Sequence, residues 1–169
     1  MNNAFVFEES GFIFDFTGSL RAFVADKPNY CGMAAVDFIV ETEDAILFIE
    51  VKNPDNKKST YWARRKFLEE LREEVFPQKM GMKFKDTLLC RWGKGERFTK
   101  PIRYIILLQF ALFSGKERGK LGERILGYIP FGLNHADFHH VIKIENFELL
   151  DFNEFRSRYR PFQIWHMQE

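Results

Sequence analysis

Two apolar segments of equal length, residues 34–41 and 45–52, are separated by only three polar residues, Thr42, Glu43 and Asp44. Both segments are rich in β-branched and aromatic residues, and a short polar break between such segments is typical of a hairpin turn. Alternate side chains of a strand point to opposite faces, and here both faces of the second strand are apolar until its last residues. The pattern predicts a β-hairpin whose second strand is buried on both sides.

The end of this second strand carries two charges, Glu50 and Lys52, which need partners because an unpaired buried charge is costly. With the turn centred between Glu43 and Asp44, Asp37 lies directly opposite Glu50 on the same face, where paired Cβ atoms are roughly 4.5–5.5 Å apart. Two facing carboxylates repel each other unless a cation lies between them. We therefore expect both acids to bind a divalent cation, with the main-chain carbonyl of Val51 as a further ligand. Lys52 shares the face and reaches the same ligand.

The rest of the chain alternates between strand and helix patterns. Residues 4–7 and 11–16 are aromatic-rich and predict a second hairpin, and residues 101–110 form an apolar run typical of a buried central strand. Helical spacing begins at Ser59, and we expect this helix to end at Pro77. Weaker patterns predict three further elements: a helix at 121–128, a strand at 140–144 and a helix at 153–159. This order of strands and helices predicts an α/β fold.

The length of 169 residues, of which 46% are hydrophobic and 29% charged, predicts one globular domain over residues 1–169. Charge is uneven, with a net −7 in residues 1–50, where two bases face nine acids, and +8 in residues 51–169, where 23 bases face 15 acids. This division favours internal ion pairs or a site where an anionic ligand meets a metal, and scattered surface charge explains it equally well. No apolar run is long enough for a bilayer and no signal peptide is visible, so we expect a cytoplasmic protein without a membrane partner.

The arrangement Val36-Asp37 followed by Ile49-Glu50-Val51-Lys52, with a helix after it, resembles the PD-(D/E)xK nuclease superfamily. The resemblance covers the first half of the chain, and the apolar run that ends at Phe110 is similar in placement to the family's fourth core strand. It implies a restriction-endonuclease-like fold, in which a central mixed β-sheet is flanked by helices. It also implies Mg²⁺-dependent cleavage of phosphodiester bonds in nucleic acid, DNA in preference to RNA, with Mn²⁺ able to substitute.

By this resemblance, Asp37 and Glu50 match the metal-binding acids, and Lys52 matches the lysine that orients or activates water and steadies the developing charge. The chain departs from the family pattern in two places. Valine replaces the usual proline before the aspartate, and the acid usually donated by an upstream helix has no clear match, Glu8 and Glu9 being candidates by position. Cleavage of both strands of a duplex by so small a protein would call for a homodimer.

Basic residues gather directly after the proposed site. We expect Lys57, Lys58, Arg64 and Arg65 to contact nucleic-acid phosphates, and residues 79–100 add seven bases against two acids. A salt-bridged helix surface is the alternative explanation for the charges near the helix. Two tryptophans, Trp62 and Trp92, lie among these basic residues. Each is either a stacking group for nucleobases or a core residue.

Three functions from different classes remain open at this point. The first is a metal-dependent nuclease, and the second is a catalytically inactive nuclease-fold module that binds nucleic acid or a partner protein. The third is a structural or dimerising module in which Glu50 and Lys52 form an internal ion pair. A divalent ion between Asp37 and Glu50 would distinguish the first from the third, and salt-sensitive DNA binding without cleavage would identify the second.

Overall fold

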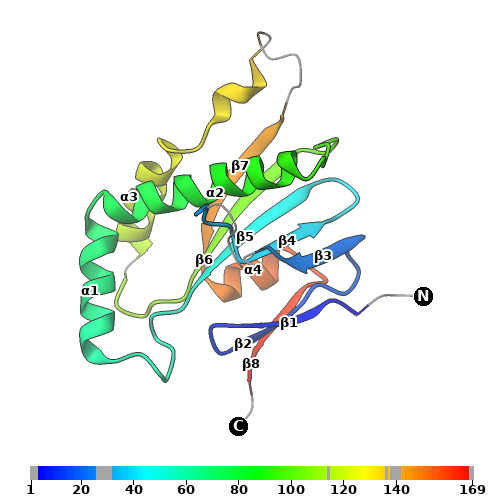
Figure 1. Ribbon diagram of the computed structural model, residues 1–169. Helices are drawn as coiled ribbons and strands as arrows, with labels where there is room; N and C mark the ends of the chain where they lie inside the picture. The colour runs from blue at the N-terminus through cyan, green and yellow to red at the C-terminus, as the bar shows by residue number, and fades with distance from the viewer. Residues whose placement is uncertain (1–3, 26–31, 114, 136, 138–141, 168–169) are drawn as a thin grey trace.

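The computed structural model describes residues 4–25, 32–113, 115–135, 137 and 142–167. Within these residues the chain forms an α/β fold with two sheets and four α-helices (Figure 1). The elements in chain order are β1 (Val6–Glu9), β2 (Phe12–Asp15), β3 (Arg21–Val24), β4 (Phe38–Glu41), β5 (Ile46–Lys52), α1 (Tyr61–Arg72), α2 (Val75–Gly93), β6 (Ile102–Leu108), α3 (Gly115–Leu126), the 3₁₀ turn η1 (Phe131–Asn134), β7 (Ile144–Leu150), α4 (Phe152–Arg158) and β8 (Gln163–His166).

The larger sheet has the strand order β3-β4-β5-β6-β7. Strands β3, β4 and β5 are antiparallel neighbours, whereas β5, β6 and β7 run parallel to one another. The connections explain this change of direction, because a tight turn returns the chain antiparallel, and parallel neighbours need a crossover such as a helix. Helices α1 and α2 form the crossover from β5 to β6, and α3 lies in the connection from β6 to β7. The predicted α/β class is confirmed.

The register of the β4–β5 hairpin agrees with the sequence prediction. Phe38 pairs with Ile49 and Glu41 pairs with Ile46, so extending the ladder by one residue sets Asp37 against Glu50. Strand β5 is buried on both faces, since no residue from Ile46 to Val51 is more than 9% exposed. The predicted central hairpin is therefore confirmed in both its turn and its burial.

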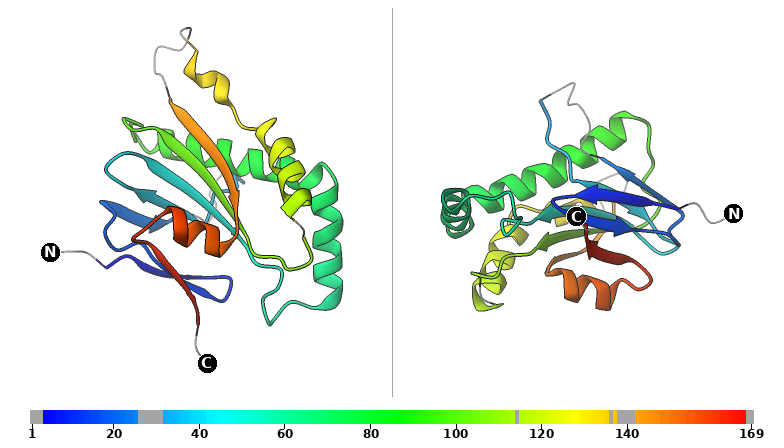
Figure 2. Two further views of the ribbon diagram at one scale, coloured as in Figure 1. Left: turned by 180° about the vertical axis from the view of Figure 1, so that it is seen from behind. Right: turned by 90° about the horizontal axis from the view of Figure 1, so that it is seen from below.

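Two apolar cores lie on opposite faces of the larger sheet. Helices α1, α2 and α3 cover one face, where the ring of Phe84 lies 5.5 Å from that of Phe48 and 5.1 Å from that of Tyr104. Helix α4 and the small sheet β1-β2-β8 cover the other face, where the rings of Phe14 and Phe38 are 5.1 Å apart. Figure 2 shows α2 and α4 on opposite sides of the strands. Alternate residues of β5 thus face two different layers, and the even-numbered ones, Glu50 included, face the helices.

Two helices occupy the segment for which the sequence predicts one. Thr60 caps α1, because its side chain accepts a hydrogen bond from the N–H of Ala63, the third residue of the helix. Helix α1 ends at Arg72, whereas the sequence predicts an end at Pro77. Pro77 lies in the first turn of α2. A backbone N–H in this turn would have no acceptor within the helix, so proline, which lacks the N–H, is tolerated there. Helix α2 was therefore missed because Pro77 starts a helix instead of ending one. Among the described residues, no helix is both long enough and apolar enough to cross a membrane.

Other elements differ from the prediction mainly in extent. The first hairpin is present, but its turn is made by Ser10 and Gly11, both with positive φ. Helix α3 starts earlier than predicted, and β7 starts at Ile144, where the predicted strand 140–144 ends; residues 140 and 141 lie outside the described ones. Strand β8 was not predicted, because it pairs with β2 from the opposite end of the chain.

Gly81 sets how closely α2 approaches the chain that follows α3. A Cβ at this position would lie 2.3 Å from the Cβ of Tyr128 and 3.0 Å from its carbonyl oxygen. Gly81→Ala is therefore expected to lower the free energy of unfolding by about 1–3 kcal/mol, although alanine is the better helix former. Gly93→Ala is the matched control, since a Cβ at the last residue of α2 meets nothing within 4 Å. Urea denaturation measures both variants, and wild-type stability of Gly81→Ala would contradict the expectation.

Candidate active site

The two carboxylates of the hairpin come together at the end of β5 that leads toward α1. Asp37 directly precedes β4 and is 8% exposed, and Glu50, the third-last residue of β5, is fully buried. The main-chain N–H of Val51 donates a 2.6 Å hydrogen bond to Oδ2 of Asp37. In a strand the N–H and C=O of one residue point to the same side, so the Val51 carbonyl is directed toward Asp37 as well. Three oxygen-bearing groups therefore converge at this place.

Two lysines neutralise the buried Glu50. Lys83 of α2 spans its carboxylate, with Nζ 2.8 Å from Oε1 and 2.9 Å from Oε2. Lys52 forms an ion pair with Oε1 from the end of β5. A carboxylate has about four lone-pair sites, and these contacts use three of them. Buried charges are tolerated when they are paired in this way.

Helix α2 is tied to the segment that carries Asp37, and this fixes Lys83 over the acids. The hydroxyl of Thr87 accepts a 2.9 Å hydrogen bond from the N–H of Val36 and donates a 2.7 Å bond to the carbonyl of Lys83. One residue earlier, the carboxylate of Asp86 accepts a 2.9 Å hydrogen bond from the N–H of Ala34. Because these bonds join one turn of α2 to residues 34–36, they fix the position of Lys83 relative to Asp37.

The environment of Asp37 favours its neutral form. Burial, together with the nearby charge of Glu50, raises the pKa of Asp37 from 3.8 to about 7. The ammonium groups of Lys52 and Lys83 and the hydrogen bond from Val51 act in the opposite direction without restoring the ordinary value. A buried carboxyl with a pKa near neutrality beside a second acid is typical of functional sites.

Lys52 remains charged in spite of its surroundings. Burial disfavours its ammonium form, but the carboxylates of Glu50 and Asp37 outweigh this effect and raise the pKa of Lys52. Glu9, at the end of β1, adds a weaker effect in the same direction. The positive charge at the mouth of the site is therefore stable, and the β1–β2 hairpin brings an acid toward it.

Neither upstream acid completes a cluster with the two hairpin carboxylates. Within the described residues, no three His, Cys, Asp or Glu side chains are grouped so that they could share a metal ion. Glu9 is directed instead to its own turn, where Oε1 accepts a 2.7 Å hydrogen bond from the hydroxyl of Ser10. A cation at Asp37 and Glu50 would thus have two carboxylates, the Val51 carbonyl, water and substrate as ligands. That donor set fits Mg²⁺, which keeps several waters and binds through one or two carboxylates plus phosphate oxygens.

Comparison of the chain with protein-family models, with curated proteins and with solved structures gave no match. The chemistry of the site is therefore inferred from its own residues.

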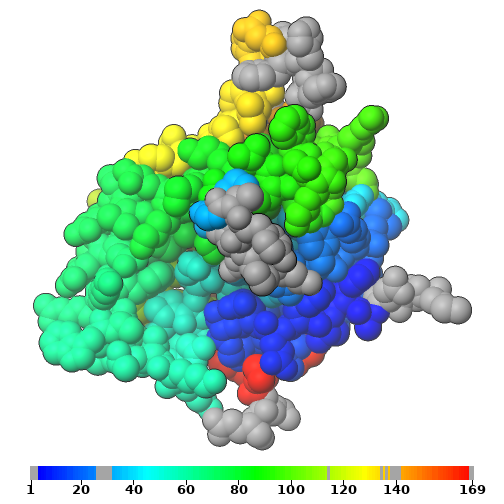
Figure 3. Space-filling view, viewed as in Figure 1, coloured from blue at the N-terminus to red at the C-terminus, as the bar shows by residue number. Residues whose placement is uncertain are grey.

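A cleft of about 1080 Å³ lies between the β1–β2 hairpin and helix α4. The β1–β2 turn, the loop of residues 53–58 that follows β5, strand β8 and helix α4 form its walls. Asn53, the residue after Lys52, lines this cleft and donates a 2.9 Å hydrogen bond to the carbonyl of Ser10. Figure 3 shows the segment before α1 and the β1–β2 hairpin next to each other on one face. The lining of the cleft therefore includes the residue that follows Lys52 in the chain, but not the side chains of Asp37, Glu50, Lys52 or Lys83.

The four predicted phosphate-binding residues have different surroundings. Lys57 and Lys58 are exposed and line the cleft. Arg64 lies 3.9 Å from Asp55, and Arg65 lies 3.5 Å from Glu69 one helical turn away, so these two arginines are engaged in ion pairs. The structure thus brings the two lysines to the cleft and places the arginines on the salt-bridged surface of α1.

Lys83 is the site residue that the sequence reasoning missed. It lies within the basic stretch 79–100, and its position in a helix became clear only from the fold. The spacing of Phe76, Met80 and Phe84, which are buried against the sheet, was the available signal for α2. A lysine one residue before such a buried position lies near the edge of the buried face, from which it can reach the sheet.

Proposed function

We propose that this protein is a Mg²⁺-dependent nuclease that hydrolyses phosphodiester bonds in nucleic acid, DNA in preference to RNA. The observation that carries the proposal is the buried pair Asp37 and Glu50, set opposite each other on one face of a hairpin with Lys52 beside them. Burial, and after it the charge of Glu50, raises the pKa of Asp37, so an ionised Asp37 is unfavourable here without a further cation. Such an arrangement is expected where a protein holds a metal.

The order of elements supports a restriction-endonuclease-like fold of the PD-(D/E)xK superfamily. Three antiparallel strands, β3 to β5, are followed by two helices and by the parallel strand β6. Asp37 directly precedes the second of these strands, and Glu50 and Lys52 lie on the third, in the order that the superfamily motif requires. Among the described residues before β3, which begin at residue 4, the upstream helix of that family has no counterpart and the β1–β2 hairpin stands instead.

The local charge balance suits a phosphodiester. With both acids ionised, Asp37 and Glu50 offset Lys52 and Lys83, so the four side chains together carry no net charge. A bound Mg²⁺ would add two positive charges, polarise the phosphate and lower the pKa of a coordinated water. Lys52, whose side chain is 27% exposed, would then supply positive charge where the transition state gains negative charge.

The metal site is tested by isothermal titration calorimetry with Mn²⁺ at pH 8, where Asp37 is ionised. We expect wild-type protein to bind the ion and Asp37→Ala/Glu50→Ala to bind none, since the double variant removes both carboxylate ligands. Glu41→Ala/Asp44→Ala removes two acids from the far end of the same hairpin and is the matched control for charge. Absence of Mn²⁺ binding to wild type, both alone and with a non-hydrolysable phosphodiester present, would overturn the proposal. Binding would be followed by cleavage assays on single-stranded and duplex DNA and RNA.

A catalytically inactive module that binds nucleic acid or protein is the second candidate. Two observations favour it: the described residues offer no third acid to the site, and Lys83 already spans both oxygens of Glu50. In that function the lysines permanently replace the metal, and the basic segment 57–66 binds without cutting. DNA retention that falls with salt and is not accompanied by Mg²⁺-dependent cleavage would support this candidate over the nuclease.

A further inference from the structure

Two neighbouring aromatic side chains protrude from the start of α1. Tyr61 is 69% exposed and Trp62 is 72% exposed, and their rings meet edge to face with centroids 5.6 Å apart. Helix α1 forms one edge of the molecule, as Figures 1 and 3 show. Large aromatic residues this exposed are uncommon on the surface of a soluble protein and mark binding surfaces. The alternative that Trp62 belongs to the core is wrong.

Basic residues surround this aromatic pair. Residues 57–66 contain five bases and no acid, which makes the segment complementary to a polyanion. Arg65 turns toward Glu69 of the same helix, whereas Lys57 and Lys58 lie in the wall of the cleft. Positive charge therefore accompanies the exposed rings on the segment that joins the cleft wall to α1.

We infer that Tyr61 and Trp62 form a stacking surface for the unpaired bases of a single-stranded nucleic acid, while Lys57 and Lys58 contact its phosphates. The inference rests on the proposed function and adds to it the kind of strand that enters the site. Bases in a duplex are already stacked on each other, so an exposed indole gains contact area only with bases that are unpaired. Phosphate contacts alone would serve a duplex equally well and would leave the protruding rings without a role.

The cleft that Lys57 and Lys58 line also presents aromatic side chains. Trp165 of β8 lines it and is 41% exposed, and the ring of His166 lies 4.1 Å from that of Phe12 on the same wall. Asn53, which follows Lys52 in the chain, lines the cleft as well. A strand held by its bases at Trp62 and by its phosphates at Lys57 and Lys58 would therefore extend along a cleft whose lining includes the residue after Lys52.

Fluorescence anisotropy in EDTA tests the stacking surface without cleavage. The probes are a labelled single strand of mixed sequence and the same strand annealed to its complement. We expect wild type to prefer the single strand and Trp62→Ala to weaken that binding about tenfold, the effect of losing one stacked base, while duplex binding is unchanged. Trp92→Ala is the matched control, because Trp92 is 62% exposed at the end of α2 and lies outside residues 57–66. Circular dichroism verifies that both variants are folded.

Three outcomes would overturn the inference: equal affinity of Trp62→Ala and wild type for the single strand, an equal loss in Trp92→Ala, or a preference of wild type for the duplex. Hydrolysis of bis(p-nitrophenyl) phosphate, a diester without bases, separates this inference from the proposed function. If wild type and Trp62→Ala hydrolyse it equally with Mn²⁺ but neither discriminates strands, the stacking surface is refuted and the catalytic proposal stands. If neither hydrolyses it but Trp62→Ala loses single-strand affinity, the inference stands and the inactive module is the better function.

Discussion

Lys52→Met is expected to lower the kcat of Mg²⁺-dependent phosphodiester hydrolysis about 100–1,000-fold while Mn²⁺ binding is retained. The range is typical for removal of one group that stabilises developing negative charge in a preorganised site. Lys52 is suited to that role because Glu50 and Asp37 raise the pKa of its ammonium group and because its side chain, at the end of β5, is partly exposed. Methionine preserves most of the length and apolar character of the side chain, so the change chiefly removes the ammonium group.

Lys83→Met is the matched comparison for this variant. Both lysines contact Glu50, but Lys83 reaches it from α2, whereas Lys52 reaches it from the end of β5, where its side chain is more exposed than that of Lys83. If the rate loss came only from unbalancing Glu50, the two variants would be equally slow. We expect Lys83→Met to lose substantially less kcat than Lys52→Met. Single-turnover cleavage at saturating metal measures both, and a wild-type rate for Lys52→Met would exclude its role in catalysis.

The hairpin and its acids could be predicted because the information is local. A polar break of three residues fixes the turn, and the period of two then decides which side chains share a face, so that Asp37 and Glu50 follow from the position of the turn. Slipping the register by one residue would place the two carboxylates on opposite faces of the hairpin. Because β5 is buried on both faces, the position of the turn, and not the pattern of burial, specifies the register.

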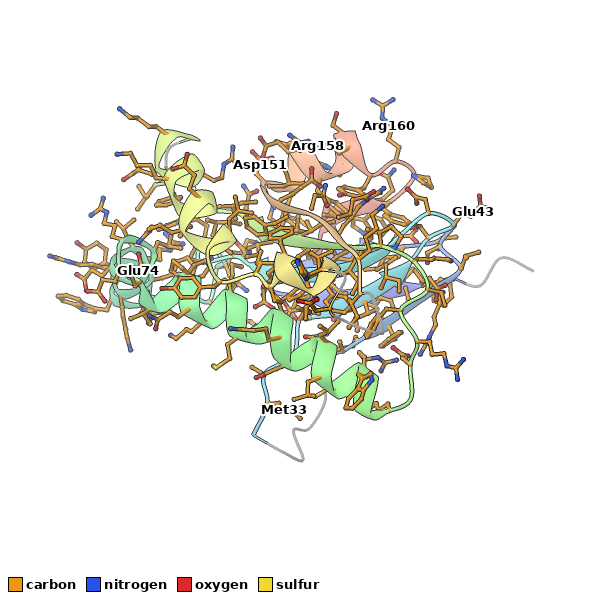
Figure 4. All side chains as sticks on the ribbon, turned by 90° about the horizontal axis from the view of Figure 1, so that it is seen from above. Met33, Glu43, Glu74, Asp151, Arg158 and Arg160 are labelled. Atoms are coloured by element: carbon orange, nitrogen blue, oxygen red, sulfur yellow. The ribbon has the colours of Figure 1, made fainter. Side chains whose placement is uncertain are left out.

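The partners of these acids were not predictable in the same way. The contact between Lys83 and Glu50 joins residues 33 positions apart and depends on how α2 packs across the sheet. Helix α2 itself was hidden because Met82, Leu89 and Trp92 place apolar side chains on its exposed face and blur the helical period. Seen from above in Figure 4, α2 crosses the sheet on the side away from Asp151 and Arg158, a packing that no local pattern specifies.

Asp37→Asn is expected to make the metal-free protein more stable at pH 8. The pKa of Asp37 is 3.8 as an ordinary carboxyl and about 7 in the folded protein, so between these values the folded state binds more protons than the unfolded state. Stability therefore falls as pH rises from about 4 to 7, and above 7 the full penalty, of about 2–4 kcal/mol, is present. Asparagine removes the charge and keeps an oxygen to accept the hydrogen bond from Val51. Urea denaturation in EDTA at pH 5 and pH 8 measures the difference, which should grow with pH.

Asp44→Asn provides a control of opposite sign from the same hairpin. The hydrogen bond from Thr42, with a smaller contribution from Arg103, lowers the pKa of Asp44, so removal of this charge is not expected to stabilise the protein at pH 8. If Asp37 were a structural partner of the lysines, Asp37→Asn would instead lower the stability at pH 8. Mn²⁺ separates the two possibilities further: by binding only the folded state it should raise the stability of wild type and leave Asp37→Asn unchanged. If Asp37 is a metal ligand, its ionised carboxylate lowers the stability of the metal-free protein, and metal binding is expected to restore that stability.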